Sequence, residues 1–287
     1  MKIYKLSDGA IIKHQHASYI LEADWDDLIN RDNLHAYLVS LLPGLSVVNE
    51  DKAAALIGMR LLPPIGSQEV WAAGVTYLRS REARMEESEA SGAADLYDKV
   101  YSAERPELFF KSQPHRVAGH SQQVYIRRDS LWSVPEPELT LFINSNGSIQ
   151  GYTIGNDMSS RSIEGENALY LPQAKIYERS AALGPCLYVP DAPVSADTVI
   201  RMTITRNGKE MYLDETSLSR MKRSLDELAG YLFRECDFQT GCFLMTGTCL
   251  VPPNDFTLHE GDIVTIHIDH IGVLVNTVSY KPEKSNS

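Results

Sequence analysis

Two glutamates stand two residues apart in the segment Pro135-Glu136-Pro137-Glu138-Leu139. The prolines keep this segment extended and exclude a helix, so both side chains project from the same face of a strand. Adjacent carboxylates repel one another unless a positive charge lies between them. If Asp157 arrives from a nearby strand, the three acids form an oxygen site that suits a hard divalent cation and leaves positions open for water and substrate.

The alternative interpretation is a solvated edge strand that carries two surface glutamates. The apolar run from Leu139 to Ile143 directly after the pair, together with the two prolines and the acid at Asp157, favours a buried metal site over this alternative.

The composition limits the class of protein. The chain has 287 residues, of which 43% are hydrophobic and 23% charged, and a formal net charge of −11. The acidic balance and the absence of a basic stripe argue against nucleic acid as a partner. No apolar run approaches the ~20 residues that a membrane helix needs, and the first residues read as a strand and not as a signal peptide. Four cysteines without a C-x-x-C pair predict a reduced, cytoplasmic location.

The pattern along the chain predicts an α+β fold with two parts: a small N-terminal α+β domain, residues 1–64, and a catalytic domain, residues 65–287. In the first part we expect three short strands followed by one helix from Asp24 to Leu42, ended by Pro43-Gly44. In the second, strands dominate, with a hairpin turn at Asn144-Ser145-Asn146-Gly147. The segment from Leu78 to about Ala103 is polar and helix-forming, either a solvated helix or a lid, with a break predicted at Ser91-Gly92. One amphipathic helix is predicted from the spacing of Leu218, Met221, Leu225, Leu228 and Leu232.

The order of several short motifs resembles the fumarylacetoacetate hydrolase superfamily over roughly Val70 to Tyr280. Each motif is weak alone, and seven in order make a specific signal. The resemblance implies a β-rich roll of mixed sheets, commonly dimeric, and a site in which Glu136, Glu138 and Asp157 bind Mg²⁺, or Mn²⁺ or Ca²⁺, with Lys175 beside the substrate. The motifs are Pro106-Glu107-Leu108-Phe109-Phe110-Lys111, the Glu136/Glu138 pair, Gly151-Tyr152 with Asn156-Asp157-Met158-Ser159-Ser160-Arg161, Gln173-Ala174-Lys175, Leu183-Gly184-Pro185, Thr246-Gly247-Thr248, and Glu260-Gly261-Asp262-Ile263-Val264 leading to Ile271-Gly272.

One departure from this pattern is informative. Hydrolytic members of the superfamily carry a histidine and a glutamate that activate water, and the matching positions here hold Ser80 and Ala83. Within the superfamily, the strongest resemblance is to the 2-keto-3-deoxy-D-arabinonate dehydratases, which share the block from Glu166 to Tyr177. The resemblance therefore implies a lyase that acts on a 2-oxo-3-deoxy sugar acid.

Such a dehydration needs a base at C3 and an acid for the departing C4 hydroxyl. A divalent cation chelated by the 2-oxo acid would stabilise the enolate that forms when the C3 proton leaves. We expect Lys175 to be the base, since a nearby cation lowers a lysine pKa from about 10.4 toward neutrality. The alternative is a permanent ammonium that holds the substrate carboxylate. Glu107 and Glu166 are the candidates for the second proton transfer.

Three further residues are candidates for substrate binding. Arg161 is expected to orient Asp157 or to form a structural salt bridge. Lys111 is expected to bind an anion, with a role at a strand end as the alternative. The hydroxyl of Thr248 is expected to donate to the substrate carboxylate, although a tight turn would also explain the glycine before it.

The sequence therefore predicts a metal-dependent, cytoplasmic hydro-lyase that converts a small-molecule 2-oxo acid, such as 2-keto-3-deoxy-arabinonate, to 2,5-dioxopentanoate, working as a homodimer or homotetramer. One alternative is an acylpyruvate hydrolase or oxaloacetate decarboxylase of the same superfamily. Another is a non-catalytic metal- or ligand-binding module that keeps the fold, and the retained Lys175 and the three acids argue against it. The stereochemistry and chain length of the substrate stay open.

Overall fold

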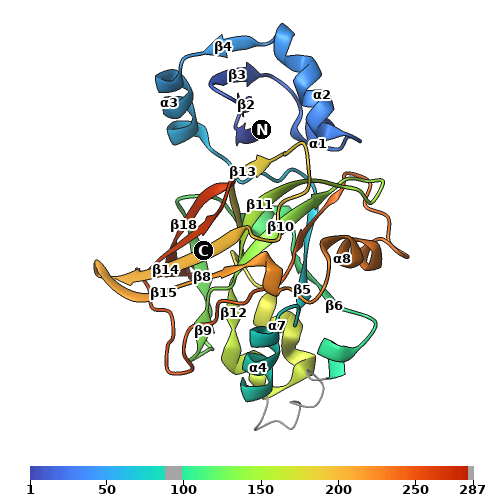
Figure 1. Cartoon of the computed structure of the whole chain (residues 1–287). Helices are drawn as coiled ribbons and strands as arrows, with labels where there is room; N and C mark the ends of the chain where they lie inside the picture. Colours follow the sequence, from blue (N-terminus) through green and yellow to red (C-terminus); the bar gives the residue numbers. More distant parts are fainter. Residues whose placement is uncertain (88–98, 284–287) are drawn as a thin grey trace.

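The computed structural model describes residues 1–87 and 99–283 of the chain. The N-terminal part lies at the top of Figure 1 and contains the three predicted strands, which are confirmed, together with a helix, α3, that the sequence analysis did not predict. Its elements are β1 (Lys2–Leu6), β2 (Gly9–His14), β3 (Ala17–Leu21), α1 (Trp25–Ile29), α2 (Leu34–Leu41), the 3-10 turn η1 (Leu42–Gly44), β4 (Ser46–Val48) and α3 (Glu50–Arg60).

The single helix predicted from Asp24 to Leu42 is wrong, because the structure divides it into α1 and α2. Asn33 has a left-handed backbone with a φ of 50°, which a continuous α-helix does not contain. The break is held by the hairpin turn after β10, where the Ser145 N–H donates to Asn30 Oδ1 at 2.8 Å and Asn144 Nδ2 donates to Asp32 Oδ1 at 2.6 Å. Tertiary hydrogen bonds therefore end α1 where the apolar spacing alone would have continued it.

The remainder of the chain is rich in strands, and the predicted hairpin turn at 144–147 joins β10 to β11. Its elements are β5 (Glu69–Gly74), α4 (Leu78–Glu87), β6 (Glu107–Ser112), η2 (Pro114–Arg116), β7 (Val117–Ala118), β8 (Gln122–Ile126), β9 (Ser133–Val134), β10 (Pro137–Ile143), β11 (Ile149–Asp157), β12 (Ser159–Ser160), α6 (Arg161–Glu166), η3 (Ala168–Tyr170), α7 (Leu171–Lys175), β13 (Ala181–Tyr188), β14 (Val199–Arg206), β15 (Lys209–Ser217), η4 (Leu218–Arg220), α8 (Leu225–Leu232), β16 (Cys242–Met245), β17 (Ile263–Ile268) and β18 (Gly272–Tyr280).

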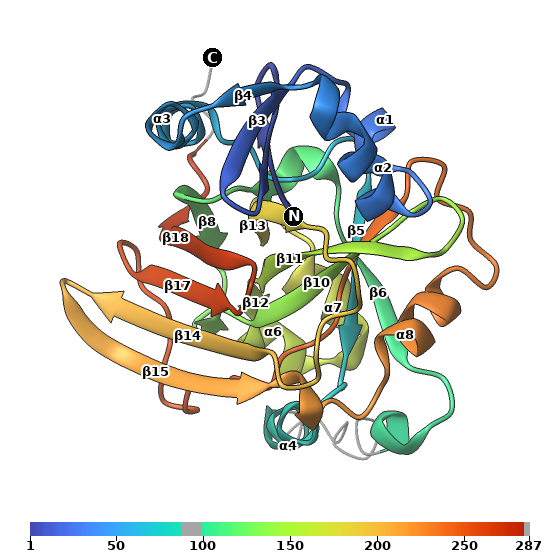
Figure 2. The same cartoon turned by 45° about the horizontal axis from the view of Figure 1, so that its top comes forward.

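Two large sheets form the body of the molecule. The first has eleven strands in the order β4-β3-β2-β1-β13-β11-β10-β16-β5-β6, with β7 paired to β13, and it mixes parallel and antiparallel neighbours. The second has five strands in the order β15-β14-β17-β18-β8, and its β14–β15 hairpin extends away from the body in Figure 2. A small pair, β9 and β12, lies beside them. The predicted α+β class with a β-rich roll of mixed sheets is confirmed.

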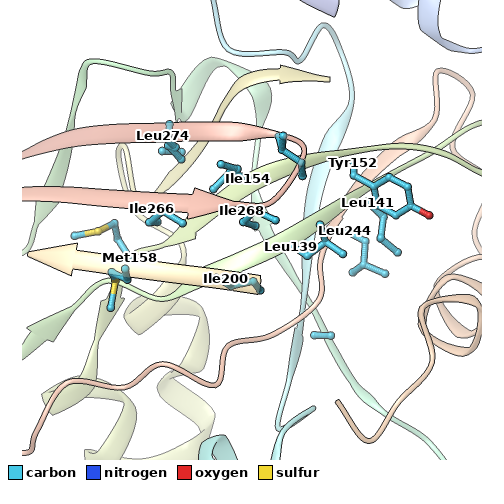
Figure 3. Close-up of a cluster of buried hydrophobic side chains, with 14 of the residues drawn as sticks. Leu139, Leu141, Tyr152, Ile154, Met158, Ile200, Leu244, Ile266, Ile268 and Leu274 are labelled. Atoms are coloured by element: carbon cyan, nitrogen blue, oxygen red, sulfur yellow. The ribbon is translucent and has the colours of Figure 1, made fainter. Parts of the chain in front are cut away.

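The main core lies between these two sheets. Figure 3 shows Leu139, Leu141 and Ile154 of the large sheet facing Ile200 and Ile266 of the five-stranded sheet, all of them buried. The strand β10 is buried along its whole length. Its other face packs toward the N-terminal helices in a second apolar cluster. A strand that is covered on both faces has a nearly continuous apolar sequence. The burial of β10 on both faces therefore explains the apolar run at residues 139–143.

The amphipathic helix predicted from Leu218 to Leu232 begins later than expected. Residues Leu218–Arg220 form the short 3-10 helix η4, Met221 makes an isolated bridge to Tyr77, and α8 begins at Leu225. The side chain of Ser224 accepts a hydrogen bond from the Glu227 N–H and so caps the helix. The three- and four-residue spacing therefore describes a helix only from Leu225 onward. Of the two earlier apolar residues, Leu218 is buried and Met221 is half-buried.

Three helices gather at the lower end of the molecule in Figure 1, where α4 packs on α6 and α6 on α7. The first ten residues of the predicted polar helix are confirmed as α4, whereas the predicted break at Ser91-Gly92 lies outside the described residues. Among the described helices, none is long and apolar enough to span a bilayer. These helices supply two of the charged residues of the candidate site.

Candidate active site

The hairpin β10–β11 brings the three predicted acids together. Glu138 is the second residue of β10 and pairs with Gly155, while Asp157 ends β11 and donates its backbone N–H to the carbonyl of Glu136 at 2.9 Å. All three side chains are buried, and each offers one carboxylate oxygen within 4.8 Å of the others. The juxtaposition predicted from the spacing is therefore present in the fold.

Burial and mutual repulsion make this carboxylate cluster electrostatically costly without a cation. Burial raises the pKa of Glu138 well above its ordinary value, and the neighbouring charges of Asp157 and Glu136 raise it further, although the Gly247 N–H donates to Glu138 Oε2 at 2.5 Å. A carboxylate whose neighbours are also acids is stabilised by a divalent ion between them. The donor set, three buried carboxylates, fits a hard cation.

The ammonium of Lys175 lies against the same cluster. This residue ends α7 and is fully buried, and its Nζ donates to Glu136 Oε2 at 2.8 Å, to Asp157 Oδ2 at 3.3 Å and to Ser159 Oγ at 2.6 Å. Burial acting alone would raise the pKa of Asp157, but the ammonium groups of Lys111 and Lys175 outweigh it and hold that pKa below its usual value. Lys175 therefore lies directly against the candidate metal ligands.

Arg161 begins α6 directly after β12 and holds the other oxygen of Glu136. Its Nη2 lies 2.6 Å from Glu136 Oε1. The sequence analysis offered two roles for Arg161, orienting Asp157 or forming a structural salt bridge, and in the structure Arg161 forms a salt bridge with Glu136. Glu136 therefore has a cation on each carboxylate oxygen, which fixes the orientation of the carboxylate.

Lys111, expected from the sequence to bind an anion, is fully buried behind Asp157. Its Nζ lies 2.5 Å from Asp157 Oδ1 and donates to the carbonyls of Met158 at 3.0 Å and Lys175 at 2.6 Å. Burial lowers the pKa of this ammonium, and the adjacent Asp157 raises it. The contacts of Lys111 thus join a candidate metal ligand to the main chain that carries Lys175.

The cluster borders a small cleft in which only about 10 Å³ is open to a water-sized molecule. One wall is formed by small residues of β5 and the loop after it, another by Phe109, and the floor by the carboxylates and their cations. The lining residues are Ala73, Gly74, Val75, Ser80, Phe109, Glu136, Glu138, Asp157, Arg161, Lys175, Gly247 and Thr248. The side chains that line the cleft therefore nearly fill it.

The remaining predicted residues lie at different distances from this cleft. Thr248 lines it, and its hydroxyl accepts a hydrogen bond from the Leu250 N–H at 3.2 Å. Glu107 is half-buried at the start of β6 opposite Gly74, where a Cβ would lie 2.1 Å from Glu107 Oε2. The glycine therefore allows this carboxylate to approach the cleft wall. Glu166 lies on the exposed side of α6.

Ser80 occupies the position that the sequence analysis matched to the histidine of hydrolytic superfamily members. Its hydroxyl donates to the carbonyl of Tyr77 at 2.8 Å and accepts from the Tyr77 N–H at 3.1 Å. These bonds stabilise the first turn of α4 at the cleft. The side chain of Ala83 lies outside the described side chains.

One buried acid near the site was missed by the sequence analysis. Glu164, on α6, has Oε2 3.9 Å from Arg161 Nε and Oε1 3.9 Å from Lys175 Nζ. Its spacing of three from Arg161 places both on one face of a helix. Glu166, five residues after Arg161, lies on another face. The three-residue spacing between Arg161 and Glu164 could have identified Glu164 only if residues 161–166 had been predicted to form a helix.

Fold and site together define a class of protein: a β-rich roll with a buried three-carboxylate metal centre and an adjacent lysine. A family model described as fumarylacetoacetate (FAA) hydrolase, C-terminal, matches residues 70–279. The chain belongs to this family.

Named relatives narrow the comparison. The chain is 47% identical over 226 residues to a probable 2-keto-3-deoxyxylonate dehydratase of Haloferax volcanii. The aligned region covers 78% of this chain and 77% of that protein. It is 41% identical over 231 residues to the 2-dehydro-3-deoxy-D-arabinonate dehydratase of Saccharolobus solfataricus, with coverages of 79% and 77%. A solved structure described as 2-keto-3-deoxy-D-arabinonate dehydratase complexed with magnesium and 2,5-dioxopentanoate superposes with a TM-score of 0.84 and 31% identity, and covers 99% of this chain and 100% of that one.

Proposed function

We propose that this protein is a Mg²⁺-dependent hydro-lyase that dehydrates a 2-keto-3-deoxy sugar acid, such as 2-keto-3-deoxy-arabinonate, to 2,5-dioxopentanoate. The observation that carries the proposal is the buried triad Glu136, Glu138 and Asp157 with Lys175 Nζ directly against it. The two dehydratase relatives and the magnesium-containing structural neighbour support the choice of reaction and metal.

The chain's own residues divide into those that hold the cation and those that act on the substrate. Glu136, Glu138 and Asp157 would hold the ion, which would supply Lewis acidity toward the carbonyl of a 2-oxo acid. Lys175 Nζ faces the cleft from beside this centre and takes the proton from C3. Arg161 and Lys111 keep the carboxylates in place.

A second group must protonate the hydroxyl that leaves C4. We assign this role to Glu107 rather than Glu166, because Glu107 lies against Gly74, which lines the cleft, whereas Glu166 is exposed. A general acid must reach its substrate atom directly or through one water, and a surface position on α6 does not meet that condition.

The rival carbon–carbon hydrolysis is disfavoured by the environment of Ser80. A water-activating base is needed at this wall, and the Ser80 hydroxyl is hydrogen-bonded to the Tyr77 peptide. A serine hydroxyl without a neighbouring base is not a general base at neutral pH. Decarboxylation of oxaloacetate would use the same metal centre, so an enzyme assay is needed to distinguish this activity from dehydration.

The proposal is tested by incubating the protein with D- and L-2-keto-3-deoxy-arabinonate, with Mg²⁺ or with EDTA, and coupling the product to a semialdehyde dehydrogenase. We expect 2,5-dioxopentanoate to appear only with Mg²⁺ and from one enantiomer. Turnover of acetylpyruvate or oxaloacetate at a comparable or higher rate would overturn the assignment.

We further propose a cytoplasmic homodimer or homotetramer. All four cysteines, Cys186, Cys236, Cys242 and Cys249, are free thiols, which supports a reducing compartment. Light scattering coupled to gel filtration measures the number of subunits, and a monomer would contradict the proposal.

A further inference from the structure

We propose that Arg223 is a positioning residue for Glu107, the carboxylate to which we assign protonation of the leaving hydroxyl. The inference rests on the proposed function and deepens it, because it names a further residue that this reaction would need. It is carried by hydrogen bonds from Arg223 to the chain directly before β6 and by the place of Glu107 as the first residue of that strand.

The guanidinium of Arg223 holds a bend at residues 103–105, which leads into β6. Its Nη1 donates to the carbonyl of Glu104 at 2.8 Å, and its Nη2 donates to the carbonyl of Ala103 at 2.5 Å. Arg223 is itself fixed in place, since it is only 7% exposed and its Nη1 lies 2.6 Å from Glu227 Oε1 on α8. A guanidinium is planar and always charged, so it can hold several acceptors in one arrangement. The bend is therefore tied to α8 through this side chain.

The other described contacts of the bend and of the helical turn before it are weaker. The side chains of the bend are exposed, so burial of apolar surface contributes little to holding it. Lys222 Nζ donates to the carbonyl of Tyr101 at an exposed position, and the Tyr231 hydroxyl lies 3.4 Å from Glu104 Oε1. Charge-assisted hydrogen bonds from a buried donor contribute more than exposed or long ones. Removal of the Arg223 guanidinium should therefore loosen the bend.

The main chain beside Arg223 holds the partner strand of β6. The Lys222 N–H donates to the carbonyl of Thr76 at 2.9 Å, two residues after β5 ends at Gly74. Gly74 pairs with Glu107 across the two strands and lines the cleft. Two adjacent residues thus hold the chain on both sides of this pair, one through its main chain and the other through its side chain.

The connection from the bend to Glu107 is short and stiff. Only Arg105 and Pro106 separate the carbonyl of Glu104 from Glu107. Proline fixes its own φ and restricts the residue before it to extended conformations, so a displacement of the bend is carried into β6. A general acid must lie within hydrogen-bond reach of the atom that it protonates, and a misplacement of ~1 Å can cost ~100-fold in rate. Loss of the guanidinium should therefore lower kcat.

A double-mutant cycle separates positioning of Glu107 from a structural role. The value of kcat for 2-keto-3-deoxy-arabinonate is measured at saturating Mg²⁺ for the wild type, Arg223→Gln, Glu107→Gln and the double variant. We expect Arg223→Gln to lower kcat about tenfold when Glu107 is present, with KM changed by less than about twofold. When Glu107 is already replaced, the same substitution should change kcat by less than about twofold. A purely structural role would lower kcat by the same factor in both backgrounds. Arg220→Gln is the control, since Arg220 is exposed three residues earlier in the chain.

Amide hydrogen exchange tests the same link without turnover. Loss of the tie should let the start of β6 open more often. We expect the amides of Glu107 and Leu108 to exchange about tenfold faster in Arg223→Gln than in the wild type, and at the wild-type rate in Arg220→Gln. The measurement is mass spectrometry of peptic fragments.

Unchanged exchange in folded Arg223→Gln, or an equal loss of kcat in both backgrounds, overturns the proposal. If Arg223→Gln does not fold, Glu227→Gln replaces it, because this change releases the guanidinium from α8 and should shift both measurements in the same direction. Unchanged values in Glu227→Gln would then overturn the proposal as well. Absent product from the wild type would refute the proposed function alone, and the exchange comparison would still decide whether Arg223 positions Glu107.

Discussion

Replacing Lys111 by Met should destabilise the metal-free protein strongly. The substitution keeps the length of the side chain and removes an ammonium that lies 2.5 Å from Asp157 Oδ1 and donates to the carbonyls of Met158 and Lys175. Removing one partner of a buried ion pair costs ~3–5 kcal/mol. Asp157 retains Lys175 Nζ at 3.3 Å, which reduces this loss, while the two carbonyls lose their donor at ~1–3 kcal/mol each. We expect a net cost of about 4 kcal/mol.

The measurement is urea or thermal unfolding in EDTA and again at saturating Mg²⁺. A cost of this size corresponds to roughly 10 °C in Tm for a domain of this length. The gap between variant and wild type should narrow with Mg²⁺, because a cation bound at the carboxylates restores positive charge beside Asp157. Lys209→Met is the matched control, since Lys209 is exposed at the start of β15, and it should change stability by less than ~0.5 kcal/mol. A Lys111→Met protein as stable as the wild type in EDTA would refute the reasoning.

Three further substitutions and one pH dependence test the site. Glu138→Gln should abolish Mg²⁺ binding, measured by calorimetry, while the circular dichroism spectrum is retained. Because the pKa of Glu138 is raised in the folded protein, the contribution of this group to the stability of the metal-free form should be fully present below its ordinary pKa of 4.5 and be lost as the pH rises through the raised pKa. Melts in EDTA should show this loss in the wild type and not in Glu138→Gln. Gly247→Ala places a Cβ 2.0 Å from Thr76 Oγ1 at a φ of +94°, so we expect weaker Mg²⁺ binding and a cost of ~1–3 kcal/mol in unfolding assays. Glu107→Gln should lower kcat at least 100-fold, and Glu166→Gln should lower it much less. A larger loss of kcat in Glu166→Gln than in Glu107→Gln would contradict our choice of Glu107 as the acid.

The juxtaposition of Glu136, Glu138 and Asp157 could be predicted from the sequence because it depends on local rules. Strand alternation and the flanking prolines fix the relation of Glu136 to Glu138, and the turn at 144–147 sets the register that brings Asp157 to the same end of the hairpin. The positions of Lys111 and Glu164 could not be predicted in this way. Lys111 is buried against an acid 46 residues later in the chain, and a strand pattern does not show such a partner.

Short elements account for the other differences. The helix α6 has only six residues, too few for a periodic pattern to separate Glu164 from Glu166. The break between α1 and α2 depends on hydrogen bonds from Ser145 and Asn144, which become visible only when distant segments are placed together. Tertiary contacts therefore decide the parts of the structure that local propensity leaves undetermined.

The pairing of β1 with β13 has a consequence for synthesis of the chain. Lys2 and Ile3 pair with Tyr188 and Leu187, and the amino group of Met1 donates to the carbonyl of Val189 at 2.9 Å, a separation of 188 residues. During synthesis on the ribosome, β1 emerges first and cannot pair with β13 until residues 181–188 have been made. Until β13 has been made, the outer side of β1 is an open edge that another nascent chain can occupy. The large sheet can therefore be completed only late in translation, when β13 pairs with the strand that was made first.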